Sequence, residues 1–121
     1  MVNKRVLVVD DSPTDRQALS NLLQRDGYEV TTAVDGEDAL EKIAANPPPL
    51  VVLDIILPKM NGYQVLRHLR ADRETRHIKV ILVSSKNQES DRFWGLKQGA
   101  DAYIAKPYPE ESLLTAVAKH L

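Results

Sequence analysis

Carboxylate side chains stand at the ends of two apolar runs in the sequence. Asp10 and Asp11 follow the run RVLVV, and Asp54 follows the run LVVL. Neighbouring acids at the edge of a core repel one another unless they are solvated in a turn or a cation compensates their charge. Mg²⁺ suits such a group, because it takes hard oxygen ligands and needs only one or two protein carboxylates, whereas Ca²⁺ needs more protein oxygens. The acids therefore predict a Mg²⁺ site, provided that the fold brings the two runs together.

A lysine and a serine end two further apolar runs. Lys106 follows DAYIA, and Ser84 follows KVILV, with Ser85 beside it as an alternative hydroxyl. An ammonium group supplies positive charge to a phosphoryl oxygen, and a hydroxyl donates a hydrogen bond to one. Combined with the carboxylates and a cation, these groups indicate phosphoryl transfer onto an aspartate.

Short apolar runs alternate with longer amphipathic segments along the chain. The short runs, rich in Val, Ile and Leu, predict strands at residues 5–10, 29–33, 50–54, 79–84 and 102–105. The longer segments predict helices near residues 13–25, 36–45, 62–72, 88–98 and 109–120. Five strand-then-helix units are typical of an α/β fold, here a doubly wound (βα)5 flavodoxin-like fold with helices on both faces of a parallel sheet. In the strand order 2-1-3-4-5 the first and third strands are neighbours, so their acids meet at the carboxyl end of the sheet.

Helix boundary signals support this division. Ser12 can cap the first helix with Pro13 at its first position. Gly27 and Gly99 follow the first and fourth helices, where a left-handed residue is expected.

The fourth helix segment carries an unusual group of residues. Trp94, Phe93 and Leu96 are expected to form core and rim rather than a ligand platform. Gly95 between them costs about 1 kcal/mol relative to alanine in a helix. It indicates either close packing or mobility at this place.

The composition limits the classes of function. The chain has 121 residues, enough for one domain (1–121) with a real core, and 16 basic against 17 acidic residues give no excess charge for nucleic acid. The absence of cysteine excludes disulfides and thiolate metal sites. The apolar runs are shorter than the roughly 20 residues that a membrane span requires, and the N-terminus enters a strand pattern without a signal peptide. We expect a stand-alone cytoplasmic domain without membrane insertion.

The acids, Ser84 and the pair Lys106-Pro107, with IILPKMNG after Asp54, together resemble the CheY-like receiver domain of two-component response regulators over essentially the whole chain. The resemblance implies that Asp54 accepts a phosphoryl group from a phosphohistidine of a histidine kinase. It also implies a Mg²⁺ site made by the full set of protein ligands, namely Asp10, Asp11, Asp54 and the main-chain carbonyl of Ile56.

The same resemblance assigns the parts of a switch. Ser84 is the switch hydroxyl, Lys106 is the phosphate partner with a cis bond before Pro107, and Tyr103 is the aromatic residue whose ring turns inward when the hydroxyl moves to the phosphate. Output is expected on the face of the fourth helix, fifth strand and fifth helix, through Asp91, Arg92, Tyr103 and Tyr108.

One segment indicates a narrower group. SSKNQESDRFWGLKQGADAYIAKPY resembles the single-domain regulators of chemotaxis-like systems that drive type IV pilus motility. This implies a monomer that binds a downstream protein of the motility machinery. Ile56 is apolar where some relatives carry a polar side chain near the attacking water. Slow loss of the phosphoryl group is therefore expected. Lys86 is expected near the opposite side of the site mouth from Ile56, where it could block or attract the water.

Two other functions are open to the same residues. A Mg²⁺-dependent phosphohydrolase would also use Asp54 as nucleophile, but it typically places an acid two residues later, where Ile56 cannot transfer protons. A constitutive scaffold would not use its acceptor at all, which the complete acidic set and Lys106 argue against. The histidines lack metal spacing and are expected at the surface, none as a phosphodonor: His68, His77 and His120.

Overall fold

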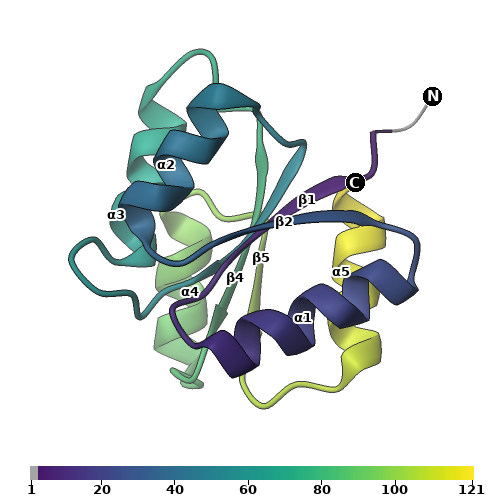
Figure 1. Ribbon diagram of the computed structural model, residues 1–121. Helices are drawn as coiled ribbons and strands as arrows, with labels where there is room; N and C mark the ends of the chain where they lie inside the picture. Colours follow the sequence, from purple (N-terminus) through teal and green to yellow (C-terminus); the bar gives the residue numbers. More distant parts are fainter. Residues whose placement is uncertain (1–2) are drawn as a thin grey trace.

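The computed structural model describes residues 3–121 and shows five strands that alternate with five helices (Figure 1). In chain order these are β1 Arg5–Val9, α1 Pro13–Arg25, β2 Glu29–Ala33, α2 Gly36–Ala45, β3 Leu50–Asp54, α3 Gly62–Ala71, β4 Lys79–Ser84, α4 Glu89–Lys97, β5 Ala102–Ala105 and α5 Glu110–His120. All strand pairs are parallel, and the sheet has the order β2-β1-β3-β4-β5. The predicted flavodoxin-like fold is confirmed.

Helices cover both faces of the sheet (Figure 1). Each face has its own apolar core. Side chains alternate between the faces along a strand, so Leu7 and Val9 of β1 join one core while Val6 and Val8 join the other. Helices α2 and α3 pack on the first face, and α1 and α5 pack on the second. Because the central strands are buried on both sides, their interior residues are apolar, and the polar residues of a site lie at or just beyond the strand ends.

The expected helix signals are present. The Ser12 side chain accepts a hydrogen bond from the Asp15 backbone N–H at 3.3 Å and caps α1. Gly27 and Gly99 have φ of 91° and 109°, the left-handed conformation in which glycine avoids a steric cost.

Several element ends differ by one residue from the sequence prediction. β1 ends at Val9 rather than at residue 10, because the Asp10 carboxylate accepts a hydrogen bond from the Ser12 N–H at 2.9 Å and starts a turn. α5 begins at Glu110, since Pro109 is the extended N-cap residue. Likewise, α3 ends at residue 71, and α4 is shorter at both ends than predicted.

The prediction for the α4 side chains was wrong. Phe93, Trp94 and Leu96 are exposed, by 66%, 49% and 37% respectively. Only Gly95 of α4 is buried. The reason is that the buried ring of Tyr103, from β5, lies directly against Gly95 and fills the space between this part of the helix and the sheet.

The Arg70 side chain ties three segments together at the end of the sheet remote from the acids. Its guanidinium donates to the carbonyl oxygens of Gly99, Arg76 and Ile78 at 3.0, 3.0 and 2.6 Å. It also donates to the Asp101 carboxylate at 3.1 Å. Gly99, two residues beyond the end of α4, is thereby fixed to α3 and to the residues that precede β4.

Among residues 3–121, no helix combines the length and the apolar character needed to cross a membrane.

Candidate functional site

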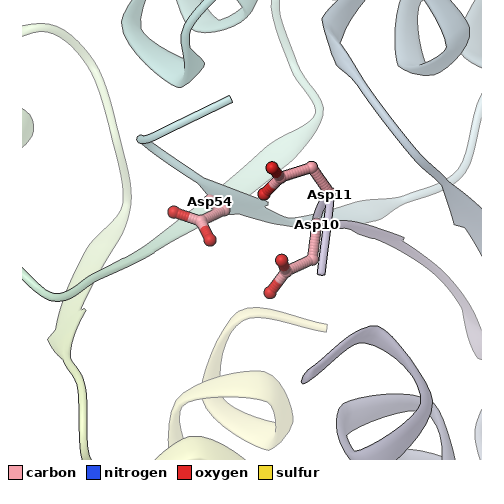
Figure 2. Close-up of side chains that lie close together, drawn as sticks. All are labelled: Asp10, Asp11 and Asp54. Atoms are coloured by element: carbon pink, nitrogen blue, oxygen red, sulfur yellow. The ribbon is translucent and has the colours of Figure 1, made fainter. Parts of the chain in front are cut away.

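Three carboxylates meet at the carboxyl ends of β1 and β3 (Figure 2). Val9 and Leu53 are paired in the sheet, so the residues that follow them, Asp10 and Asp54, lie side by side at the ends of neighbouring strands. One oxygen from each of Asp10, Asp11 and Asp54 lies within 4.8 Å of the others. Asp10 and Asp54 are buried and Asp11 is exposed, so the group is open to solvent on one side.

Backbone donors hold two of these carboxylates in place. Asp10 accepts from the Ser12 N–H, and Asp54 accepts from the Ile56 N–H at 3.0 Å. In each case a single oxygen, Oδ1, takes the backbone bond, and the other oxygen is left for a partner in the site.

That partner is the ammonium group of Lys106. Its Nζ donates to Asp10 Oδ2 at 3.2 Å and to Asp54 Oδ2 at 3.1 Å. It also contacts Asp15 Oδ2 at 3.4 Å, an interaction that sequence reasoning missed. The available signal was the position of Asp15 in the first turn of α1, at the same edge of the sheet as the predicted site.

The electrostatics of the site follow from this arrangement. Burial raises the pKa of Asp54, and the Asp10 charge adds to the increase, although Lys106 and the Ile56 N–H oppose it. Burial lowers the pKa of Lys106, but its contacts with Asp54 and Asp10 outweigh that effect, so this pKa is raised overall. Lys106 is a fixed positive charge at neutral pH, while Asp54 retains a proton to a higher pH than an ordinary aspartate.

The serine and the tyrosine predicted for the switch are joined through one residue. Ser84 Oγ, on a fully buried side chain, accepts from the Lys86 N–H at 3.1 Å. The Tyr103 hydroxyl donates to the Lys86 carbonyl at 2.8 Å. The two peptide groups of Lys86 thus connect the end of β4 to β5, which sequence reasoning did not foresee.

The remaining predicted residues are placed as follows. The bond between Lys106 and Pro107 is cis. Of the residues expected on an output face, Asp91, Arg92 and Tyr108 reach the surface, whereas Tyr103 is 8% exposed and does not present its ring there. His68 and His77 are exposed and His120 is partly exposed.

A family model described as the response regulator receiver domain matches residues 6–118. The chain belongs to this family. The receiver domain is 42% identical to protein PilH of Pseudomonas aeruginosa, over 93% of each chain. It is 38% identical to protein PilG of the same organism, over 97% of this chain and 87% of PilG. It also matches the alkaline phosphatase synthesis transcriptional regulatory protein PhoP of Bacillus subtilis at 41% identity, over 88% of this chain but 44% of PhoP.

Solved structures agree with this assignment. The chemotaxis response regulator CheY4 of Vibrio cholerae superposes with a TM-score of 0.91 at 30% identity, over 99% of this receiver domain and all of CheY4. The receiver domain of the sensor histidine kinase PA1611 from Pseudomonas aeruginosa superposes with a TM-score of 0.89 at 26% identity, over 98% of each chain, and holds a magnesium ion in its active-site cleft. The predicted CheY-like receiver is confirmed: the chain is a phosphoacceptor switch of the two-component type.

Proposed function

We propose that this chain is a single-domain response regulator that accepts a phosphoryl group on Asp54 from a histidine kinase. One observation carries the proposal: the buried Asp54 carboxylate lies beside two other acids and bonds to the Lys106 ammonium. This arrangement offers a nucleophilic oxygen, a site for a cation and a fixed positive charge within one small region.

In the proposed reaction an oxygen of Asp54 forms a bond to phosphorus while the bond from phosphorus to the donor histidine nitrogen breaks. The nitrogen keeps the electron pair, and Asp54 becomes an acyl phosphate. Lys106 balances the incoming charge, because its Nζ already lies 3.1 Å from Asp54 Oδ2 and can move onto a phosphoryl oxygen.

The donor set fits Mg²⁺. Asp10, Asp11 and Asp54 supply carboxylate oxygens that lie close together, and the exposed side of the group leaves room for water and phosphoryl oxygens. The Ile56 carbonyl is proposed as a further ligand. When bound, the ion would neutralise charge on the transferring group.

The added phosphoryl group carries about −1.5 to −2 charge. The Ser84 hydroxyl would donate to it, and the link through Lys86 to Tyr103 would transmit this to the face formed by α4, β5 and α5. We propose a downstream protein as the target, and the similarity to PilH and PilG supports pilus-related or chemotaxis-like signalling. A monomeric state and a cytoplasmic location remain predictions.

The test is labelling by acetyl phosphate with and without Mg²⁺. The parent should be labelled only with Mg²⁺, and Asp54→Asn should not be labelled. Asp26→Asn, an exposed acid at the end of α1, serves as the matched control and should label normally. Label that persists in Asp54→Asn, or steady turnover of a general phosphomonoester through Asp54, would overturn the proposal.

We further propose that the phosphoryl group is lost slowly without a phosphatase. The Ile56 side chain is 53% exposed, and it has no polar atom to orient an attacking water. Ile56→Gln should shorten the lifetime of the phosphorylated protein in Mg²⁺ buffer relative to the parent. Equal lifetimes in the two proteins would count against this role.

A further inference from the structure

Gly95 lies where the Tyr103 ring meets α4. A Cβ atom built on Gly95 would stand 2.7 Å from Cδ2 and 3.2 Å from Cε2 of Tyr103. It would also stand 3.1 Å from Cδ1 of Leu82, on the strand beneath. Real Cβ contacts are not found below 3.0 Å, so any side chain here would have to displace the ring.

The ring position matters because of what its hydroxyl holds. With the ring buried, Tyr103 donates to the Lys86 carbonyl, and the Lys86 N–H donates to Ser84 Oγ. A serine oxygen that accepts from one side keeps its own proton free for another acceptor. The buried ring therefore keeps the Ser84 hydroxyl in an orientation from which it can donate to a phosphoryl oxygen on Asp54.

We infer that Gly95 is a positioning residue for the phosphoryl switch. The space left by its missing Cβ admits the Tyr103 ring, and through Lys86 it prepares Ser84 for the phosphoryl group. This inference rests on the proposed function of Asp54. It explains why glycine stands inside α4, although glycine is unfavourable in a helix interior. Alanine at this position would stabilise an isolated helix by about 1 kcal/mol.

The effect on phosphoryl binding follows by linkage. In a variant whose side chain excludes the ring, the ring must be forced back into its buried position before Ser84 is held in place, so a phosphoryl mimic binds more weakly. Overpacking of this severity corresponds to roughly tenfold weaker binding of beryllofluoride in the presence of Mg²⁺. A substitution that acted only through helix stability would not weaken beryllofluoride binding.

The test is a double-mutant cycle between positions 95 and 103, measured as beryllofluoride affinity from Trp94 fluorescence. Gly95→Ala should weaken binding about tenfold in the parent background, but less than about twofold in a Tyr103→Ala background, where there is no ring to displace. Ser90→Ala, an exposed α4 change that raises helix propensity without nearing Tyr103, should leave the affinity unchanged. An equal loss in both backgrounds, or none in either, would overturn the inference.

A second measurement needs no phosphoryl mimic. In the parent, NMR should show a nuclear Overhauser effect between the Gly95 Hα and the Tyr103 ring. In Gly95→Ala, but not in Ser90→Ala, a soluble paramagnetic agent should relax the Tyr103 ring protons more strongly. If the parent does not bind beryllofluoride, the proposed function fails. The NMR spectra then still test, independently, whether Gly95 admits the Tyr103 ring. A Tyr103 ring remote from Gly95 in the parent would refute it.

Discussion

Gly62 occupies the place where the first turn of α3 touches the end of β3. A Cβ atom at this position would lie 2.4 Å from the backbone oxygen of Asp54 and 2.8 Å from the Cα of Ile55. The first distance falls about 1 Å short of the 3.4 Å at which ordinary contact begins. Both neighbours are backbone atoms of the strand end that carries the proposed acceptor, so neither can rotate away.

The cost of Gly62→Ala can be worked from this contact. Overpacking costs about 1–3 kcal/mol, with the upper part of that range expected for a clash with backbone. The gain in helix propensity offsets at most about 1 kcal/mol. We expect a net loss of about 2 kcal/mol, a fall of roughly 6–10 °C in the melting temperature of a domain of this size.

The assay pairs urea denaturation with acetyl phosphate labelling, and Gly27→Ala is the matched control. Gly27 has a left-handed φ of 91°, and nothing lies within 4 Å of its hypothetical Cβ. This variant should lose about 1–2 kcal/mol through backbone strain while labelling normally. Gly62→Ala should lose both stability and labelling. The reasoning is refuted if Gly62→Ala matches the parent in stability, or labels as well as Gly27→Ala.

Three further predictions concern the cation, the pH and the core. Mg²⁺ at ten times its dissociation constant should stabilise the fold by about 1.4 kcal/mol; Asp11→Asn should abolish this thermal shift, and a shift that persists would contradict the site. Because burial raises the pKa of Asp54 and a protonated carboxyl cannot bind the ion, Mg²⁺ affinity should fall as the pH drops through that raised pKa. The affinity is measured by fluorescence titration at several pH values. If it did not change until the pH reached 3.8, the ordinary pKa of an aspartate, the result would argue against this. Leu113→Ala, at a fully buried position on α5, should cost about 2–5 kcal/mol in urea denaturation, and clearly more than Leu114→Ala at its partly buried neighbour.

The sequence predicted those features that depend on local pattern. Strands buried on both faces have apolar interiors, so β3 and β4 were found with their observed bounds, and the polar residues that end them, Asp54 and Ser84, marked the site. Ser12 and Gly27 act through bonds and dihedral angles close by in the chain, so the two ends of α1 were also predictable.

The features that were missed depend on contacts between distant segments. Phe93, Trp94 and Leu96 were expected to form core and rim, but all three are exposed, because the Tyr103 ring fills the space between this part of α4 and the sheet. The contact of Asp15 with Lys106 joins residues 91 positions apart. The bonds through Lys86 use backbone atoms, which carry no signature in the sequence.

The four hydrogen bonds of the Arg70 guanidinium have a mechanical consequence for α4. One of them fixes Gly99, two residues beyond the C-terminal end of α4, to α3, while the N-terminal end of α4 follows the loop that carries Lys86. Any rigid rotation of α4 must therefore turn about Gly99, and displacement grows along the helix toward Glu89. With a rise of about 1.5 Å per residue, nine residues make an arm of roughly 13 Å, so a tilt of about 10° moves its far end by about 2 Å. Binding of a partner to the N-terminal end of α4 would therefore depend on the switch far more strongly than binding to its C-terminal end.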